Sequence, residues 1–206
     1  MSLAAATRRT LIGLVATLSA SAAPSAVTAP QADDMSLGDR NAPVTVVEYA
    51  SVGCPHCARW NNEVFAPFKA KFVDTGRARF VVREMLTGEP DLAAAGFLVA
   101  RCAGPAKYFD VIEAEYRRQG LILDGEANAG AVLGEIARSA GLTDAQFNAC
   151  LGDANALKAL NARAERHAQE DGVDSTPTFF VDGQRLDGYA TLDQLAAAMP
   201  KPPARR

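Results

Sequence analysis

One short segment constrains this chain more than any other: the quartet Cys54-Pro55-His56-Cys57, which follows a β-branched, apolar run. We expect a strand at 42–51, because a strand buried on both faces reads as a nearly continuous apolar run. Proline is favoured in the first turn of a helix, so Pro55 predicts that a helix begins there. The two cysteines therefore stand where a strand gives way to a helix.

The remaining pattern predicts an α/β chain in three parts. A second strand at 76–85 completes a strand–helix–strand unit, whose parallel pair requires a right-handed crossover. Apolar residues then recur at helical spacing over 90–171. Two β runs return at 176–186 around Asp182-Gly183, a strong hairpin signal. A final helix is expected after the capping residue Thr191.

The N-terminus has the pattern of an export signal. Arg8 and Arg9 precede an apolar run at 10–18, and small residues follow. The run is too short to span a membrane, so we predict a signal peptide over 1–26, with cleavage near 23–26. The twin arginines leave both the general secretory and the twin-arginine routes open. Residues 27–36, rich in Ala and Pro, are expected to form a flexible lead-in.

Composition narrows the class of protein. The chain has 206 residues, of which 49% are hydrophobic and 22% charged, and its net charge is −3. These values are typical of one soluble globular domain. Basic residues do not interleave with aromatic ones in a stripe, so we expect no nucleic-acid partner.

Several chemistries use closely spaced cysteines, and most of them fit poorly. A structural zinc site needs four ligands, whereas the remaining cysteines stand singly on predicted helices, so we expect no metal. Covalent haem attachment needs histidine directly after the second cysteine, where this chain has Ala58. A purely structural disulfide stays open, although its two-residue loop would constrain the unfolded chain little.

A redox role fits the placement of the quartet. At a helix start, free backbone N–H groups and the helix dipole stabilise an anion, so we expect a lowered pKa for the Cys54 thiol. His56 adds a possible cationic donor beside the sulfur. A stabilised dithiol form makes the corresponding Cys54–Cys57 disulfide an oxidant. In an exported protein such a disulfide can form and persist.

Over roughly 37–199, the chain resembles the DsbA-like branch of the thioredoxin superfamily. The resemblance rests on Cys54-Pro55-His56-Cys57 after "VTVVEYA" and on Thr176-Pro177 before "TFFV". It implies a thioredoxin-like fold with a helical domain inserted between the βαβ and ββα halves. The expected divisions are a first thioredoxin-like part (37–89), a helical insert (90–172), a second thioredoxin-like part (173–199) and a tail (200–206).

The resemblance also assigns roles to residues outside the quartet. It implies a cis Thr176–Pro177 bond that lines the substrate groove. It implies that Glu48 is a buried acid beneath the quartet, which accepts or relays the proton of Cys57. Cys102 and Cys150 depart from the simplest family members; both lie in the insert, and in an exported protein we expect them to form a structural disulfide.

Other conspicuous side chains are expected to be structural. Trp60 and the aromatic stripe Phe65, Phe68 and Phe72 fit a buried helix face. His167 stands between polar neighbours and is expected on a solvated face.

The resulting hypothesis is an exported, monomeric thiol–disulfide oxidoreductase of the periplasm. It would donate the Cys54–Cys57 disulfide to reduced, unfolded secreted proteins, without an organic cofactor. In this family a membrane partner, a quinone-coupled oxidase, restores the disulfide. Two alternatives stay open: a disulfide isomerase or reductase kept reduced by a membrane electron donor, and a non-catalytic chaperone on the same fold.

Overall fold

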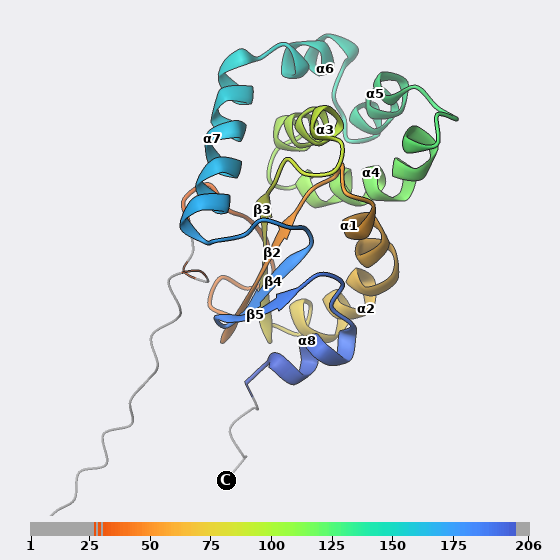
Figure 1. The fold of residues 1–206 in the computed structure, drawn as a ribbon. Helices are drawn as coiled ribbons and strands as arrows, with labels where there is room; N and C mark the ends of the chain where they lie inside the picture. The colour runs from red at the N-terminus through yellow and green to blue at the C-terminus, as the bar shows by residue number, and fades with distance from the viewer. Residues whose placement is uncertain (1–26, 28, 30, 201–206) are drawn as a thin grey trace, which may run out of the picture.

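The computed structural model describes residues 27, 29 and 31–200. The predicted signal peptide and nearly all of the predicted tail therefore lie outside the described residues. At the centre is a mixed sheet of order β1-β3-β2-β4-β5, in which only β2 and β3 are parallel (Figure 1). Its strands are β1 (Met35–Leu37), β2 (Val44–Ala50), β3 (Ala78–Glu84), β4 (Thr178–Val181) and β5 (Gln184–Asp187).

The helix after β2 is continuous from residue 55 to residue 73, but two of its stretches are π-helical. Pro67 lies in this helix and has no N–H to donate, so the regular hydrogen-bond ladder is interrupted around it. The expected aromatic core is confirmed, because Trp60 and Phe68 are fully buried. The successive stretches are α1 (Pro55–Trp60), η2 (Asn61–Phe65), α2 (Ala66–Phe68) and η3 (Lys69–Val73).

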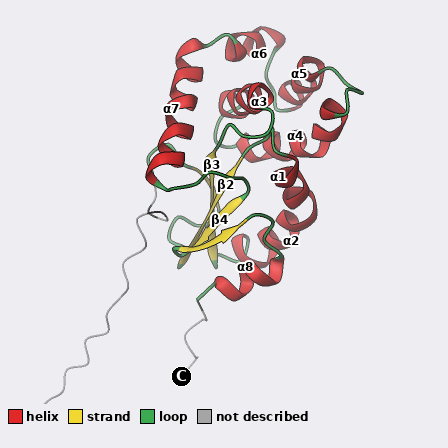
Figure 2. Ribbon diagram, in the orientation of Figure 1, coloured by secondary structure: helices red, strands yellow, loops and turns green. Residues whose placement is uncertain are grey.

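A block of helices stands between β3 and β4 and packs above the sheet (Figures 1 and 2). The fold class is therefore confirmed: a βαβ half, a helical insert and a ββα half. The last half ends in α8 (Leu192–Ala198), with Thr191 as its cap. The insert consists of α3 (Pro90–Cys102), α4 (Tyr108–Leu123), α5 (Ala129–Ser139), α6 (Asp144–Leu151) and α7 (Ala154–Glu170).

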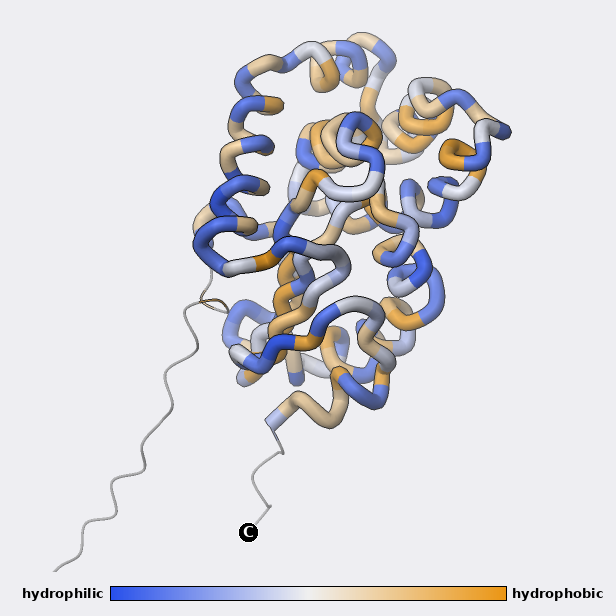
Figure 3. The backbone as a smooth tube through the Cα atoms, viewed as in Figure 1, coloured by the Kyte–Doolittle hydropathy of each residue, from blue (hydrophilic) through white to orange (hydrophobic). Residues whose placement is uncertain are grey.

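The two faces of β2 enter different clusters. Val46 and Ala50 belong to the main core, with the helix that begins at Pro55, whereas Val47 and Tyr49 join a smaller cluster on the other face. Successive side chains of a strand point to opposite faces, so Glu48 points into the main core. The end of α7 covers the smaller cluster; Figure 3 shows its turns alternating between hydrophilic and hydrophobic, as expected for a helix with one buried face.

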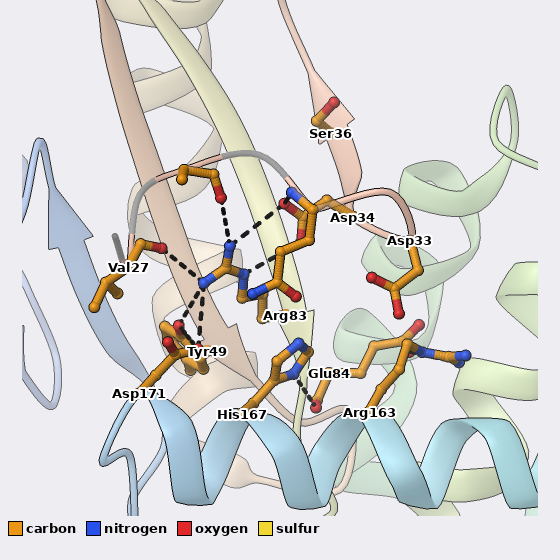
Figure 4. Close-up of polar contacts among 12 residues, drawn as sticks. Val27, Asp33, Asp34, Ser36, Tyr49, Arg83, Glu84, Arg163, His167 and Asp171 are labelled. Carbon is orange, nitrogen blue, oxygen red and sulfur yellow. Dashed lines mark hydrogen bonds and ion pairs between the residues drawn. The ribbon is translucent and has the colours of Figure 1, made fainter. Parts of the chain in front are cut away.

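The expected flexible lead-in is wrong for its last residues, which are tied to the sheet. Met35 and Ser36 lie in β1 and pair with β3. The fully buried guanidinium of Arg83 forms an ion pair with Asp34, at 3.2 Å, and donates to the Val27 carbonyl at 2.7 Å (Figure 4). An arginine buried inside a strand must be neutralised and hydrogen-bonded, and this segment supplies its partners.

The expected solvated position of His167 is also wrong. Its residue surface is only 3% exposed, and its Nδ1 lies 3.2 Å from the Glu84 carbonyl oxygen (Figure 4). The ring packs edge-on against Tyr49. Polar neighbours in sequence misled the prediction, because His167 follows Leu160 and Ala164 at helical spacing on the buried stripe of α7.

Candidate active site

The quartet lies where β2 passes into α1. Cys54 is the residue that precedes the helix, with extended backbone angles, and Pro55 occupies the first turn. The Cys54 N–H donates to the Ser51 carbonyl at 3.0 Å, which turns the chain sharply after the strand. Both cysteines are free thiols. Cys54 is 6% exposed, whereas Cys57 is shielded entirely, at 0%.

The second segment of the resemblance meets the quartet from across the fold. The Thr176–Pro177 peptide bond is cis. The Cys54 thiol donates to the Thr176 carbonyl oxygen with a distance of 3.4 Å between sulfur and oxygen. Pro177 has no N–H of its own to leave unpaired in this position. Two segments 122 residues apart in sequence therefore form one site around the Cys54 sulfur.

Hydrogen bonds to the Cys54 sulfur lower the pKa of its thiol to about 5. The largest cause is the hydrogen bond from the Cys57 side chain, against which burial acts. The Thr176 side chain and the backbone N–H groups of Cys57 and His56 add further hydrogen bonds. The helix start therefore acts as expected, but His56 contributes through its backbone N–H, while the residue itself is exposed.

The pKa of Cys57 moves the opposite way, well above its usual range. Burial is the largest cause, and the hydrogen bond to Cys54 and the nearby Glu48 carboxylate act in the same direction. At neutral pH the first sulfur is therefore a thiolate and the second a thiol. This asymmetry makes Cys54 the better nucleophile and leaving group of the two.

Glu48 is buried beneath the pair, with 2% of its surface exposed. Its Oε1 has no hydrogen-bond partner among the described residues. Burial, and then the Cys54 charge, raise the pKa of its carboxyl well above the usual range. A carboxyl group that holds its proton next to a thiol can exchange that proton with the thiol.

Sequence reasoning missed the loop between β3 and α3, which presses against the quartet. The Glu89 N–H donates to the Gly53 carbonyl at 3.1 Å. A Cβ atom on Gly88 would overlap that same carbonyl, and one on Gly53 would overlap the Glu89 backbone. Both positions therefore need glycine. The pattern that could have pointed to this loop is Gly88, which follows the predicted strand and stands two residues before Pro90 opens a helix.

A second buried acid was also missed, on the insert side of the site. Glu115 on α4 is 5% exposed, and neither of its carboxylate oxygens has a partner among the described residues. Burial raises the pKa of Glu115 to about 8. One turn further along α4, Gln119 donates to the Val52 carbonyl at 2.6 Å. The insert is therefore fastened to the segment that leads into Cys54.

An open cleft adjoins the quartet. Its volume is about 550 Å³, and its lining includes Gly53 and Pro55 on one side and Ile122 and Leu123 at the end of α4 on the other. Leu123 is 36% exposed. Leu92 adds to the apolar part of this lining, and Glu89 and Asp91 make the rest of it acidic, so the surface beside the Cys54 segment is mixed.

The other two cysteines lie far from this chemistry. Cys102 at the end of α3 and Cys150 in α6 are joined by a disulfide, with Cα atoms 6.2 Å apart. The bond links an early insert helix to a late one.

In residues 27, 29 and 31–200, no cluster of three or more His, Cys, Asp and Glu side chains is arranged to hold a metal ion. None of the helices in that part is both long enough and apolar enough to cross a bilayer.

Comparisons with known proteins identify the family to which this fold belongs. Residues 31–201 match the model of the Thioredoxin family. A Rickettsia bellii protein named as a protein-disulfide oxidoreductase is 30% identical over 169 residues, which are 82% of this chain and 64% of the relative. The chain thus spans less than two thirds of the length of that relative.

Solved structures agree with the fold. α-DsbA1 of Wolbachia pipientis is 24% identical with a TM-score of 0.73, over 82% of this chain and 89% of that one. A thioredoxin-like oxidoreductase from Silicibacter pomeroyi is 30% identical with a TM-score of 0.62, over 82% and 91% of the two chains. The fold and the cysteine pair define a thioredoxin-type protein. The chain belongs to the Thioredoxin family, and its fold, with the helical insert, resembles that of α-DsbA1.

Proposed function

We propose that this protein is an exported thiol–disulfide oxidoreductase that introduces disulfides into other proteins through Cys54 and Cys57. The observation that carries the proposal is the opposite direction of the two pKa shifts. A pair with one stabilised thiolate favours the dithiol state, so its disulfide accepts electrons readily. The names of two similar proteins, a protein-disulfide oxidoreductase and a thioredoxin-like oxidoreductase, support the same reaction class.

The reaction balances as two thiol–disulfide exchanges. A substrate thiolate attacks the Cys54 sulfur, the Cys54–Cys57 bond breaks, and Cys57 leaves as a thiolate. Because the pKa of Cys57 is high, this sulfur takes a proton, which the Glu48 carboxyl donates. A second substrate thiolate then attacks the substrate sulfur of the mixed disulfide. Cys54 is released as a thiolate, the enzyme has gained two electrons, and the substrate has gained one disulfide.

The surroundings of Cys54 give a substrate chain two surfaces. We propose that its backbone lies against the Thr176-Pro177 segment, whose carbonyl already faces the sulfur. Extended peptides commonly bind by pairing their backbone with an exposed edge. Apolar side chains of an unfolded substrate would reach the cleft beside Pro55. Reduced, unfolded secreted proteins are the proposed substrates because they offer both thiols and exposed apolar groups.

Export and partners belong to the same proposal. The charged and apolar pattern of residues 1–26 supports a signal peptide and a periplasmic location. A quinone-coupled membrane oxidase would reoxidise the monomeric enzyme. Fractionation of cells that express the full chain, with sequencing of the mature N-terminus, tests export; a protein retained in the cytoplasm with its first residues intact would contradict it.

The reduction potential tests the direction of the reaction. Equilibration of the purified protein with glutathione buffers should give a potential well above that of thioredoxin, about −270 mV. The protein should also oxidise a reduced, unfolded test protein. A thioredoxin-like potential would favour the reductase or isomerase alternative, and the absence of any exchange would favour a non-catalytic chaperone.

We propose a structural role for the Cys102–Cys150 disulfide. It closes a loop of 48 residues, which in the chain-entropy treatment stabilises the fold by about 4 kcal/mol. The double variant Cys102→Ser, Cys150→Ser should unfold at a lower temperature and keep most of its oxidase activity. Loss of activity in the folded variant would instead show that this pair takes part in the redox reaction.

A further inference from the structure

The β3–α3 loop touches both segments that surround the Cys54 sulfur. On one side, the Ser51 hydroxyl donates to the Thr87 carbonyl at 2.8 Å. On the other side, the Thr87 and Thr176 hydroxyl oxygens are 2.6 Å apart. Thr87 is therefore the residue through which the loop joins the turn before Cys54 to the cis-proline segment.

The hydrogen bonds that the sulfur needs determine which of the two threonine hydroxyl groups donates to the other. A neutral Cys54 thiol donates to the Thr176 carbonyl. Once ionised, the sulfur only accepts, and hydrogen bonding by the Thr176 side chain is among the causes that lower the pKa of the Cys54 thiol. A hydroxyl has a single proton. If Thr176 gives its proton to the sulfur, the proton in the short contact with Thr87 must come from Thr87.

We propose that Thr87 is a positioning residue, whose hydroxyl donates to Thr176 Oγ1 and thereby holds the Thr176 O–H toward the Cys54 thiolate. The inference rests on the proposed redox role of Cys54. A hydroxyl that accepts one hydrogen bond is polarised and becomes a stronger donor in the next. The chain Thr87–Thr176–Cys54 thus connects a residue outside the quartet to the reactive sulfur.

Thr87 is well placed for this role because its backbone is fixed. Ser51 occupies its carbonyl, and the glycine contact between Gly53 and Gly88 holds the next residue of the loop against the quartet. Substitution at Thr87 changes no charge. The titratable groups that act on the Cys54 thiol, namely Cys57 and the buried Glu48, stay in place.

If the Thr87–Thr176 hydrogen bond had the opposite direction, we would expect the opposite change in the stability of the Cys54 thiolate. If Thr176 donated to Thr87, removal of the Thr87 hydroxyl would free the Thr176 proton for the sulfur, and the thiolate would become more stable. If Thr87 donates, the same change removes the group that orients Thr176, and the thiolate becomes less stable. The sign of one measured change therefore decides between the two arrangements.

The experiment compares Thr87→Val with Thr87→Ser, which keeps the hydroxyl. The acid dissociation of Cys54 is followed by thiolate absorbance and by the pH dependence of its alkylation rate. Thr87→Val should lower the dissociation constant roughly three- to ten-fold, as expected for the loss of one net hydrogen bond. The equilibrium constant with glutathione should shift toward the disulfide by a similar factor. Thr87→Ser should stay close to the wild type.

Two further variants separate an effect at the sulfur from general damage. Thr75→Val removes an exposed hydroxyl that bonds to the Lys71 carbonyl, far from the quartet, and should leave the thiolate unchanged. In a Thr176→Val background, Thr87→Val should have no additional effect, because the chain is already broken.

An unchanged or higher dissociation constant in Thr87→Val would overturn the proposal, and so would a Thr87→Ser variant as impaired as the valine one. If Thr87→Val fails to fold, Thr87→Ala, which also lacks the hydroxyl, takes its place, with the same expected loss relative to Thr87→Ser. A low reduction potential in the wild type would contradict the oxidase function alone, since the serine–valine contrast is read on the Cys54 thiolate itself.

Discussion

Two glutamates on neighbouring strands of one sheet have opposite surroundings. Glu48 on β2 pairs with Val82 on β3, and Glu84 on β3 pairs with Ala50 on β2. Both are almost fully buried. Glu84 contacts Arg101 at 2.6 Å and Arg163 at 3.0 Å, and accepts from the Tyr108 hydroxyl at 3.0 Å. Glu48 leaves one oxygen without any partner among the described residues.

The difference shows how one residue type serves two purposes. Burial of a carboxylate costs several kcal/mol unless partners neutralise it. Two guanidinium groups and a hydroxyl offset that cost at Glu84, so this side chain fastens β3 to the insert. At Glu48 no ion pair within the described part of the chain offsets this cost, and the raised pKa of its carboxyl favours the protonated form instead. A buried acid with one unpaired oxygen, next to a redox thiol, is therefore suited to proton transfer.

The largest effect is expected when the same change is made at the paired site. Glu84→Gln removes the charge between Arg101 and Arg163, which leaves two guanidinium groups together with few other partners. The free energy of unfolding should fall by about 3 kcal/mol, measured by urea denaturation. Glu48→Gln is the matched control and should cost far less. Equal losses at the two positions would remove the distinction between them.

The second expected effect is on the rate of thiol exchange. Here a change at Glu48 should matter more than a change at Glu84. Glu48→Gln should slow the step that displaces Cys57 by about tenfold or more, because glutamine cannot supply the proton. Rapid trapping of the mixed disulfide with a model thiol measures this step. Glu84→Gln, where folded, should react at nearly the wild-type rate. A normal rate in Glu48→Gln across pH would leave Glu48 without a catalytic role.

The third effect is the pH dependence of stability. Burial raises the pKa of Glu48 in the folded protein above its unfolded value, near 4.5. Between the two pKa values the folded state binds the additional proton, so this contribution is complete below the unfolded pKa and is lost as pH rises through the folded one. Glutamine does not titrate. The stability of the dithiol wild type should therefore fall relative to Glu48→Gln as pH rises from 4 toward neutrality; a constant difference would contradict the shift.

Whether a feature of the fold or the site could be predicted from the sequence depends on how far apart in sequence the contacting residues are. The quartet, the Asp182-Gly183 hairpin and the helix cap at Thr191 are signals within a few residues, and each led to a correct element. Glu48 stood out because a charge within an apolar strand is expensive.

The features that escaped prediction arise from contacts between distant segments. Thr87 and Thr176 are 89 residues apart, and although the Thr176-Pro177 motif stood out, nothing in the segment around Thr87 indicated their contact. Arg83 and Asp34 are 49 apart, and their pairing turned an expected flexible segment into an anchored one. Periodicity finds which face of a helix is buried, but it does not tell which buried polar groups will meet there.

The smallest expected effect is on stability, and it compares the surroundings of Glu84 and Glu48 through two tyrosines of α4. The Tyr108 hydroxyl donates to Glu84 at 3.0 Å, whereas the buried Tyr116 hydroxyl has no partner among the described residues and lies on the side of Cys57 and Glu48. Tyr108→Phe should lower the free energy of unfolding by about 1 kcal/mol, because it removes a hydrogen bond to a buried carboxylate. Tyr116→Phe removes an unsatisfied group and should leave stability unchanged or slightly higher. Paired urea titrations decide, and a larger loss in Tyr116→Phe would show that the Glu48 side contains a polar partner after all.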